Sequence, residues 1–357
     1  MVDHPHPVPL SVLDLAPVTT ATTPAQALER ATELARHAEA LGFHRFWVAE
    51  HHNIPMIASS APDVLIAHLA SQTDRIRLGS GGVMLPNHAP LVVAERFAML
   101  EALHPGRIDL GIGRAPGTDQ RTAAALRRDH GALGERDFLA LVEQLRSFLD
   151  GDFPADHPYA GMRAIPGPGP RPPLWLLGSS TFSAQAAALL GERFSFAHHI
   201  GGSRVAVPAL ELYRERFQPT ERLAAPQAKL TVSAVCADTE EQARDLATSG
   251  ALAIARLFTG KPAPIASPAE VAAHAFTEHE RPIFEDYLTR GIIGDPETVA
   301  ARLRRLLERT GADELMITAS IYDPAAHRRS LELIADAMGV QPPARVATAP
   351  APPARST

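Results

Sequence analysis

Residues 77–117 read RLGSGGVMLPNHAPLVVAERFAMLEALHPGRIDLGIGRAPG, and this segment gives the clearest indication of the fold. A β-prone run over Ile76–Leu85 precedes an apolar helical pattern over Pro90–Leu103. A second β-prone run over Ile108–Ile112 follows, after a His-Pro-Gly breaker. Runs that are continuously apolar rather than alternating are typical of strands covered on both faces. The order strand, helix, strand therefore predicts a β/α/β unit with parallel strands.

The same alternation continues on both sides of this stretch. Helical patterns such as Pro24–Leu41, Ser183–Leu190 and Pro296–Arg309 separate further β-prone runs. Eight such β/α units predict an α/β protein with a (β/α)8 TIM barrel, and a doubly wound open sheet is the alternative. The eight runs are Leu10–Leu15, Arg45–Ala49, Ile76–Leu85, Ile108–Ile112, Leu174–Leu177, Phe194–Ala197, Leu230–Cys236 and Glu314–Ile321.

Two segments are longer than one β/α unit requires. Residues 115–172 hold a long polar helical pattern over Gln120–Asp150 and then a Pro/Gly-rich stretch, and residues 258–295 lie between the last two predicted strands. Barrels carry such insertions on the loops of the C-terminal face, so we expect both to shape the substrate pocket. We predict a barrel domain over 8–340 and a disordered Pro/Ala-rich tail over 341–357, where five of the 17 residues are proline.

The composition excludes several classes of protein. The formal net charge of −6, from 34 basic and 40 acidic residues, argues against a protein that binds nucleic-acid backbones. A single cysteine, Cys236, excludes a disulfide framework and a multi-cysteine metal site. We expect no membrane partner, because the chain has no run of 18 apolar residues, and no secretory signal. A reducing cytoplasm is therefore the expected location.

The second predicted strand ends in AEHHN at residues 49–53, which places two histidines side by side. Successive residues of a strand face opposite sides, so at most one of His51 and His52 faces the barrel mouth. The pair is either structural or functional, since histidine can hold or move a proton near neutral pH. A metal site is a rival interpretation, but no His-x-His or His-Glu-x-x-His pattern completes one, and the histidines at 88, 198 and 199 are scattered.

Glycines and hydroxyl residues follow three other predicted strands. Three glycines in GSGG at 79–82 indicate either a bulge where a ligand approaches closely or a tight bend. The GIGRAPG segment at 111–117 is a weak dinucleotide signal, but Arg114 suits either phosphate recognition or a structural ion pair. The small residues Gly178, Ser179 and Ser180 precede a helix, as an N-cap alone or as a cap that also binds an anion. Together these residues favour a phosphate-bearing cofactor over the barrel mouth.

With these motifs the sequence resembles the luciferase-like flavin monooxygenases, the family that includes the α subunit of bacterial luciferase. The resemblance covers about residues 8–340 and is closest to a single-chain subgroup. It depends on AEHHN at 49–53, the whole stretch at 77–117, LWLLGSS at 174–180 and IIGDPETVAARL at 292–303. The ordered stretch at 77–117 makes this match specific.

The resemblance implies a barrel that binds reduced FMN at its C-terminal mouth, forms a C4a-peroxyflavin with O2 and inserts one oxygen atom into a small organic substrate. By position, His51 and its neighbouring acid Glu50 match the catalytic end of the site. Because no NAD(P)H fingerprint is present, the resemblance implies a separate flavin reductase that supplies the reduced FMN. It also implies a homodimer paired through the helices over Pro62–Ala70 and Pro90–Leu103.

The cofactor-binding residues implied by the resemblance come from three loops. Gly81 and Gly82 match a bulge that carries a cis non-proline peptide in the family, while Arg114 and Ser179 match phosphate contacts. The neighbours Ser80, Gly178 and Ser180 are included in the expected cofactor site, and no metal site is expected.

Two departures from the family limit what the resemblance implies. Gly113 stands where luciferase has a cysteine beside the flavin, and Gly178 stands where it has an acidic residue. Light emission and aldehyde handling are therefore not expected to transfer. Three alternatives remain: an oxidoreductase that uses the deazaflavin F420, a flavin-binding barrel without turnover, and a metal hydrolase. The sequence does not identify the organic substrate.

Overall fold

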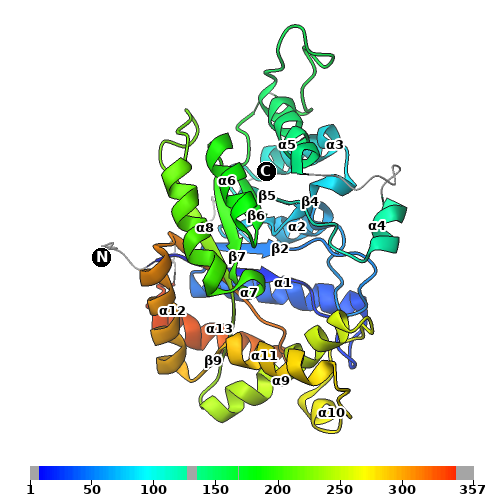
Figure 1. Cartoon of the computed structure of the whole chain (residues 1–357), viewed down its shortest axis with the longest axis vertical. Coiled ribbons are helices and arrows are strands. Elements are labelled where there is room, and N and C mark those ends of the chain that lie inside the picture. The colour runs from blue at the N-terminus through cyan, green and yellow to red at the C-terminus, as the bar shows by residue number, and fades with distance from the viewer. Residues whose placement is uncertain (1–7, 127–134, 168, 343–357) are drawn as a thin grey trace, which may run out of the picture.

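The computed structural model describes residues 8–126, 135–167 and 169–342 of the chain. Its strands and helices alternate along most of the sequence (Figure 1). The strands are β1 (Leu10–Asp14), β2 (Arg45–Val48), β3 (Arg77–Ser80), β4 (Val83–Met84), β5 (Ile108–Gly113), β6 (Leu174–Gly178), β7 (Arg193–Ala197), β8 (Ala228–Cys236), β9 (Ile292–Gly294) and β10 (Glu314–Thr318). The helices are α1 (Pro24–Leu41), α2 (Pro62–Gln72), the 3-10 helix η1 (Leu85–Asn87), α3 (Pro90–Leu103), α4 (Gln120–Leu126), α5 (Glu135–Asp150), α6 (Thr181–Leu190), α7 (His198–Gly201), α8 (Ser203–Arg216), α9 (Glu240–Phe258), α10 (Pro268–Ala272), α11 (Glu280–Arg290), α12 (Pro296–Thr310) and α13 (Pro324–Met338).

Eight parallel strands close into a barrel in the order β1, β2, β3, β5, β6, β7, β8 and β10. Closure is complete because β10 pairs with β8 on one side and with β1 on the other. The (β/α)8 barrel predicted from the sequence is thus confirmed, and the open sheet is wrong, since an open sheet would leave two unpaired edges. The short strand β9 lies outside the ring and extends the carboxyl half of β8.

The helices begin and end where the sequence signals place them. Thr23 and Gln26 form a capping box at the start of α1, and Gly42 ends that helix in the left-handed conformation at φ 92°. Asp295 accepts a hydrogen bond from the backbone N–H of Thr298 and so caps α12. The boundaries predicted for α1 and α3 are confirmed, and α6 begins two residues earlier than predicted.

Three sequence expectations need correction. The run Ile76–Leu85 is not one strand, because it breaks at Gly81 and Gly82 into β3 and β4 and ends in η1. Strand β9 was missed, since its three residues are too few to give a pattern. Within the predicted helix Gln120–Asp150, the structure describes α4 and α5. Helix α5 is amphipathic rather than polar, and it buries Phe138, Val142, Leu145 and Phe148.

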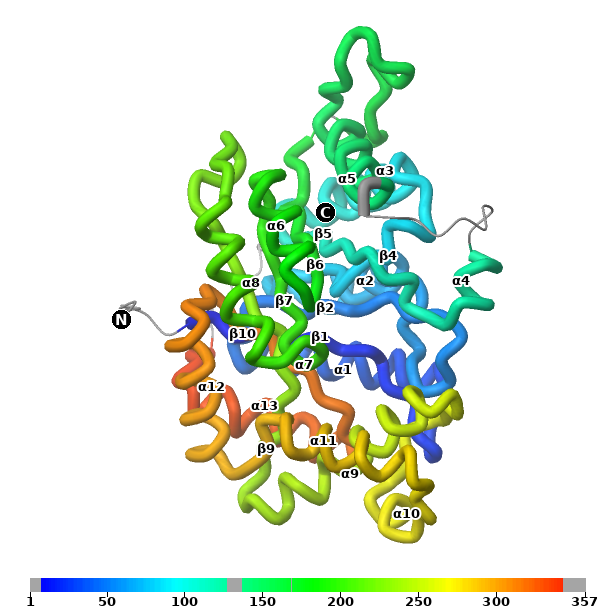
Figure 2. The backbone as a smooth tube through the Cα atoms, viewed as in Figure 1, coloured from blue at the N-terminus to red at the C-terminus, as the bar shows by residue number. Residues whose placement is uncertain are grey.

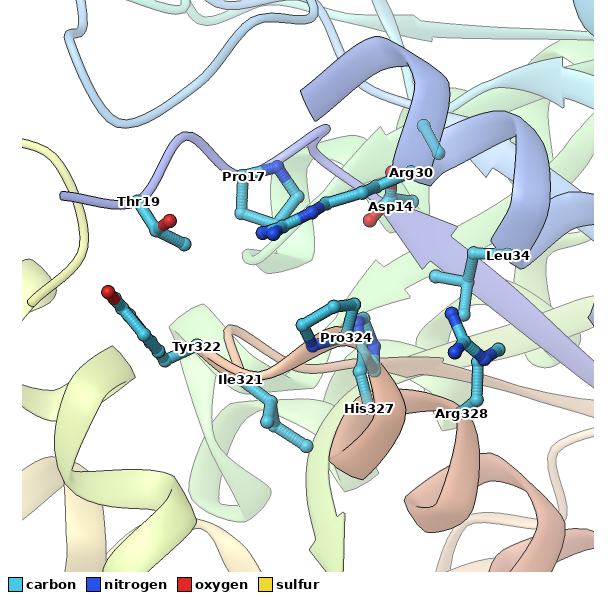
Figure 3. A pocket seen from close by; sticks show the side chains of 11 residues that line it. Asp14, Pro17, Thr19, Arg30, Leu34, Ile321, Tyr322, Pro324, His327 and Arg328 are labelled. Atoms are coloured by element: carbon cyan, nitrogen blue, oxygen red, sulfur yellow. The ribbon is translucent and has the colours of Figure 1, made fainter. Parts of the chain in front are cut away.

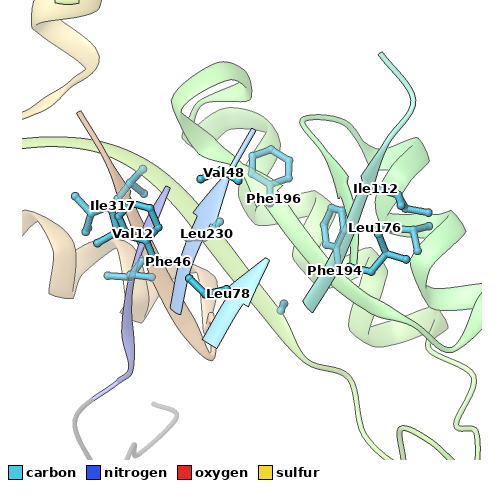
Figure 4. Packing of buried hydrophobic residues seen from close by; sticks show 14 of the residues in the cluster. Val12, Phe46, Val48, Leu78, Ile112, Leu176, Phe194, Phe196, Leu230 and Ile317 are labelled. Carbon is cyan, nitrogen blue, oxygen red and sulfur yellow. The ribbon is translucent and has the colours of Figure 1, made fainter. Parts of the chain in front are cut away.

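Most of the core lies between the outer face of the barrel and the surrounding helices. Outward-facing residues of neighbouring strands, such as Val12, Phe46 and Ile317, pack there in one continuous cluster (Figure 4). Burial of each such side chain contributes about 1.5–3 kcal/mol to folding before entropy is counted. This outer layer stabilises the barrel. The side chains that face the interior of the barrel are of other types.

The interior at the N-terminal ends of the strands is filled by a layer of paired charges. Arg45 lies 2.7 Å from Asp109 and 2.9 Å from Glu314, and Arg77 also pairs with Asp109 at 2.7 Å. The hydroxyl of Ser11 donates to Glu314 at 2.6 Å. Arg45, Asp109 and Glu314 are buried or nearly so, and their mutual hydrogen bonds offset much of the cost of removing these charges from water.

The two long insertions do not lie together. Residues 259–267 meet the loop after β1, where the N–H of Thr20 donates to the carbonyl of Ile265. Residues 151–167 instead project past α5, and residues 169–173 lead into the start of β6 (Figures 1 and 2). There Arg171 pairs with Asp150 and Glu192. The expectation that all of 115–172 shapes the substrate pocket is therefore wrong for its second half, because a helix that follows a strand returns the chain to the opposite end of the barrel.

The last described residues lie on the N-terminal side of the barrel. Gln341 and Pro342 lie against Gly42, where an added Cβ would be 2.2 Å from the carbonyl oxygen of Gln341. The rest of the predicted tail, residues 343–357, lies outside the described part of the chain. No helix within 8–126, 135–167 and 169–342 is long and apolar enough to cross a membrane.

Candidate active site

The candidate site is the mouth of the barrel, the space bounded by the carboxyl ends of its eight strands. Inside the barrel, Trp47 and Trp175 pack edge to face at 5.8 Å and are covered by Leu13 and Met316. Leu15 and Leu177 pack against this tryptophan cluster, which forms the floor of the mouth, and five other inward positions nearer the mouth carry small residues. These positions are Ala49, Gly81, Gly113, Ala197 and Ser233.

The residues after β2 continue its alternation into the mouth. Trp47 and Ala49 face the interior cluster, and His51 continues this inward series. Its Nδ1 atom is buried without a hydrogen-bond partner among the residues that the structure describes. Burial lowers the pKa of His51 to about 4, so the ring is neutral at physiological pH. The ordinary histidine pKa assumed from the sequence does not hold here.

Glu50 faces the other way and holds several segments together. It is 0% exposed, and its carboxylate lies 2.8 Å from Nε2 of His52 and 2.9 Å from Nε2 of His88. It also accepts the backbone N–H of Met84 at 2.9 Å. Burial alone would raise the pKa of Glu50, but these hydrogen bonds hold it below its ordinary value. Glu50, expected to be catalytic, therefore lies behind the mouth with its carboxylate bonded to His52, His88 and Met84.

His52 joins the loop after β2 to the loop after β5. Its backbone N–H donates to the carbonyl of Gly117, and its carbonyl accepts from the hydroxyl of Thr118 at 2.6 Å. The next residue, Asn53, adopts φ 55° and donates to Thr122 of α4 at 3.0 Å. The structural role expected for His52 fits these contacts.

The glycines after β3 bring backbone to the mouth. The peptide between Gly81 and Gly82 is cis, as the resemblance implies. A Cβ on Gly81 would lie 2.6 Å from a methyl group of Leu13, and one on Gly82 would lie 2.8 Å from the carbonyl oxygen of Gly111. Ser80, also predicted to bind the cofactor, is fully buried and exchanges hydrogen bonds with Gly111. Its hydroxyl points into the sheet and is bonded to Gly111, so this group is not directed into the mouth.

Arg114 and the first turn of α6 lie together on the adjacent side of the mouth. The guanidinium of Arg114 stacks over the ring of Phe182 at 4.7 Å, which places a cation beside the start of that helix. Ser180 is the N-cap residue, but its side chain makes no capping hydrogen bond. A Cβ on Gly178 would lie 1.7 Å from the hydroxyl of Ser183, so no acidic side chain fits there.

These residues fit the phosphate of a mononucleotide. An oxyanion accepts hydrogen bonds from donors of three kinds that are present here. They are the backbone N–H groups of the first turn of α6, the hydroxyl of Ser180, which makes no capping hydrogen bond, and the guanidinium of Arg114. Ser179 is half-buried beside them, and a Cβ added at Gly201, in the segment after β7, would lie 2.7 Å from its carbonyl oxygen. The structure thus brings the predicted residues Arg114, Ser179 and Ser180 together.

Sequence reasoning missed two groups at the mouth. His198 and His199 directly follow β7, so the strand-end rule that selected His51 could have selected them. Tyr287 comes from α11 and reaches Ser233 of β8, with 3.2 Å between the two hydroxyl oxygens. A tyrosine on a helix of the long insertion carries no local signal that it reaches the barrel.

A small pocket elsewhere does not compete for this role. It lies between the end of β1 and helices α1 and α13, and Figure 3 shows Asp14, Arg30, His327 and Arg328 around it. Its volume is about 30 Å³, enough for one or two water molecules rather than a cofactor ring. In the parts of the chain covered by the structure, no three His, Cys, Asp or Glu side chains are grouped to hold a metal ion.

Comparison with known families and proteins gives a consistent result. A family model described as luciferase-like monooxygenase matches residues 8–314. The uncharacterized protein YvbT of Bacillus subtilis strain 168 is 47% identical, covering 92% of this chain and 96% of its own. A luciferase-like monooxygenase of Escherichia coli K12 is 42% identical, with coverage of 92% and 96%. An N-acetyl-S-alkylcysteine monooxygenase of B. subtilis strain 168 is 37% identical, with coverage of 92% and 98%.

Solved structures show the same architecture. Apo-MsnO8 superposes with a TM-score of 0.84 at 37% identity, covering 94% of this chain and 99% of that one. Two more distant structures share the fold alone. One is an F420-dependent secondary alcohol dehydrogenase, with a TM-score of 0.69, 16% identity and coverage of 93% and 99%. The other is the FMN-bound oxygenating constituent of 3,6-diketocamphane monooxygenase from Pseudomonas putida, with a TM-score of 0.66, 19% identity and coverage of 93% and 98%.

Proposed function

The chain belongs to the luciferase-like monooxygenase family, and on that premise we propose that it uses reduced FMN and O2 to oxygenate a small organic substrate. One oxygen atom enters the substrate and the other leaves as water, with the two electrons coming from the flavin. The observation that carries the choice of FMN is the stacking of Arg114 on Phe182 at the start of α6. This arrangement provides one phosphate site, which suits a mononucleotide.

Each part of the mouth has a task in this proposal. Arg114, Ser179 and Ser180 bind the phosphate, and the flat ring lies beside the Gly81–Gly82 backbone, which packs closely against Leu13 and Gly111. When bound, reduced flavin supplies the electrons that activate O2. The protein then controls protons and water around the reacting atoms.

His51 is the residue that we assign to proton control. Because its ring is neutral, the nitrogen that lacks a hydrogen can accept a proton or hydrogen bond from the reacting groups. Nδ1 is buried without a partner among the described residues, so the hydrogen-bonding capacity of this atom is not used within the protein. General acid–base catalysis of this kind typically contributes about 10²–10⁴-fold in rate. Glu50 supports the site by holding His52, His88 and Met84 in place.

The assembly and supply of the enzyme are further parts of the proposal. A separate flavin reductase provides reduced FMN in the cytoplasm. A homodimer forms through α2 and α3, where Val64, Val92, Met99 and Leu103 present exposed apolar side chains. Most soluble oligomers are symmetric pairs, and apolar side chains grouped on a surface mark such contacts.

The test is a reconstituted reaction. The purified protein is mixed anaerobically with FMN and a flavin reductase with NADH, and O2 is then admitted with a candidate substrate. N-acetyl-S-alkylcysteines are the first compounds to try, because a relative is an N-acetyl-S-alkylcysteine monooxygenase. We expect an oxygenated product to form in proportion to NADH consumed, with little hydrogen peroxide.

Other outcomes select the alternatives. Product formation or substrate oxidation only with reduced or oxidised F420 would assign the barrel to deazaflavin chemistry, which a structural neighbour carries out on the same fold. FMN binding without product from a broad substrate panel, and with all O2 released as peroxide, would favour a flavin-binding protein without turnover. A reaction mixture without the protein serves as the control for peroxide made by the reductase alone.

A further inference from the structure

A polar side chain is accessible from the mouth on the wall formed by β8. Ser233 comes four residues after Lys229, whose Nζ lies 2.9 Å from the centre of the Trp47 ring inside the barrel, so both side chains face the interior. Of the nine residues of β8, Ser233 alone is partly exposed, and all the others are buried. Solvent therefore reaches Ser233 from inside the barrel, through the mouth.

Tyr287 contacts Ser233 where β8 changes its partner strand. The pair of Ser233 and Thr318 is the last one between β8 and β10, and the next residues of β8 pair with β9. Helix α11 packs along α9 (Figure 1), and the ring of Tyr287 packs against a cluster that contains Val235 of β8 and Ala319 after β10. The hydroxyl oxygens of Tyr287 and Ser233 are 3.2 Å apart, within hydrogen-bond reach.

The hydrogens of these two hydroxyls set the direction of the contact. Each group has one O–H, and the hydrogen bond between them uses only one of the two. A phenol is a stronger acid than an aliphatic alcohol, so Tyr287 is the better donor and Ser233 the better acceptor. Burial raises the pKa of Tyr287, which keeps the hydrogen on its oxygen. The O–H of Ser233 then has no acceptor among the described residues.

The surroundings of this donor favour a neutral acceptor. No charged side chain in the described part of the chain forms a hydrogen bond with Ser233 or Tyr287. A carboxylate placed there would lose its hydration without gaining a cation, whereas a carbonyl oxygen needs only one O–H donor. Strands β3 and β8 are four places apart in the ring of eight, so Ser233 lies on the wall opposite the Gly81–Gly82 backbone.

We propose that the O–H of Ser233, oriented by Tyr287, binds a neutral carbonyl oxygen that anchors the organic substrate. Ser233 is then a specificity-determining residue that touches the substrate, and Tyr287 is a positioning residue that acts through Ser233. The substrate class is a largely apolar molecule with a ketone, ester or amide oxygen, held with this oxygen on the β8 wall. The inference rests on the proposed function for the identity of the substrate, but binding of a carbonyl compound is measured without turnover.

The test is equilibrium binding of two probes of nearly the same shape. Acetophenone has a carbonyl oxygen, and α-methylstyrene has a methylene group in its place. Each is titrated into the purified protein, with and without oxidised FMN, and its dissociation constant is measured by ligand-observed nuclear magnetic resonance. The variants are Ser233→Ala, Tyr287→Phe and the double variant. Tyr322→Phe is the matched control, because it removes a phenol hydroxyl that contacts Thr20 instead.

The wild type and Tyr322→Phe should bind acetophenone more tightly than α-methylstyrene. Ser233→Ala should weaken acetophenone binding about two- to tenfold, the range of one neutral hydrogen bond, and leave α-methylstyrene binding unchanged. Tyr287→Phe should weaken acetophenone binding by a smaller factor, and the double variant should match Ser233→Ala, because Tyr287 acts through Ser233. The proposal is overturned if the wild type binds the two probes equally or binds neither, or if Ser233→Ala binds acetophenone as well as the wild type. Additive losses in the double variant contradict the positioning role of Tyr287.

The carbonyl stretching band of the bound probe gives a second readout. A hydrogen bond lowers the stretching frequency of a carbonyl group, so infrared spectra of isotope-labelled acetophenone report the contact directly. The band should lie at lower frequency in the wild type than in Ser233→Ala, whereas a merely structural role of Ser233 would leave it in place. Should Ser233→Ala fail to fold, Ser233→Cys replaces it, since a thiol is a weak donor. If the wild type binds no flavin or forms no product, the proposed function fails, but the probes still decide whether Ser233 binds a carbonyl oxygen.

Discussion

Nε2 of His88 lies 2.9 Å and 3.0 Å from the two carboxylate oxygens of Glu50, so one buried acid joins the end of β2 to the segment after η1. The same carboxylate holds His52 and the N–H of Met84. These partners lie on both sides of the mouth loop at Gly81 and Gly82. Glu50 thus holds the Gly81–Gly82 backbone of the proposed flavin site at a fixed position relative to His51.

Replacing Glu50 by Gln should lower the free energy of unfolding by about 1.5–3 kcal/mol, because hydrogen bonds to a charged acceptor become neutral ones. The pKa of Glu50 is lowered in the folded protein, so its contribution is complete above the ordinary value of 4.5 and is lost as the pH falls toward the folded pKa. The wild type and Glu50→Gln should therefore converge in acid. Urea unfolding across pH measures this, with exposed Glu29→Gln as the control; a constant difference at all pH values would contradict it.

Replacing Arg114 by Ala should weaken FMN binding by roughly 1.5–3 kcal/mol, the value of one charge-assisted contact. The chain has two tryptophans, Trp47 and Trp175, and both lie in the floor of the mouth. Quenching of their fluorescence by added FMN therefore measures the dissociation constant without turnover. Arg121→Ala on nearby α4 is the matched control and should leave the constant unchanged. An unchanged constant in Arg114→Ala would remove this residue from the site.

Replacing His51 by Ala should retain the fold and FMN affinity, yet release hydrogen peroxide in place of oxygenated product. The reason is that the inward ring of His51 is the proposed proton-handling group, whereas His52 faces Glu50 and the loop after β5. Replacing His52 by Ala should lower stability without diverting oxygen to peroxide. Product and peroxide per NADH are the measurements, and near-normal coupling in His51→Ala would refute this division between the two histidines.

Stability should rise with pH between about 4 and 6.5. Burial lowers the pKa of His51, His198 and His327 to about 4 in the folded protein. The contribution of each neutral ring to folding stability is therefore complete above the unfolded-state pKa of 6.5 and is lost as the pH falls toward 4. Asp14 opposes this trend, because burial raises its pKa to about 6 and its contribution is lost as the pH rises through that value. Three histidines favour the rise and Asp14 alone opposes it, so the net slope of unfolding free energy against pH is positive.

A single variant tests this account. His327 is 8% exposed, and His327→Asn should reduce the slope of unfolding free energy against pH by about 1.4 kcal/mol per pH unit within that range. The exposed His279→Asn should leave the slope as it is. Equal slopes in all three proteins would show that His327 takes up its proton without unfolding.

The homodimer should depend on the apolar face of α2 and α3. Leu103 is 65% exposed at the end of α3, and Leu103→Glu would place a charge in the proposed contact. Phe258 is 73% exposed at the end of α9, so Phe258→Glu is a control of similar exposure on another helix. Light scattering over a wide concentration range should show a dimer for the wild type and Phe258→Glu, and a weakened dimer for Leu103→Glu. A mass of 38 kDa for the wild type throughout would contradict the dimer.

The fold could be predicted because its signals are local and repeated. The hydrophobic period, the capping residues and the helix-breaking residues define helices such as α1 and α3. Eight strand–helix units in one chain are compatible with few architectures. The same rule of alternation along a strand separates His51 from His52. It could not show that burial shifts the pKa of His51 to about 4, because that depends on neighbours brought by the fold.

The missed features depend on contacts between distant segments. Glu50 looks like a catalytic acid beside His51, and only His88 and Met84, more than 30 residues away, show that its oxygens are already used. Ser80 looks like a loop hydroxyl, but Gly111 on β5 takes up its hydrogen bonds. Tyr287 reaches Ser233 across 54 residues. No short pattern contains such information.

The contact between Ser11 and Glu314 joins residues 303 positions apart, and it has a consequence for how the chain reaches its native state. Strand β1 leaves the ribosome long before β10, the strand that lies between it and β8. Until β10 arrives, the growing sheet has two unpaired edges, and Arg45 lacks one of its two carboxylate partners. A chain cut before residue 314 would therefore lose ring closure as well as one strand. Synthesis of the last barrel strand is the event that turns an aggregation-prone open sheet into a protected one.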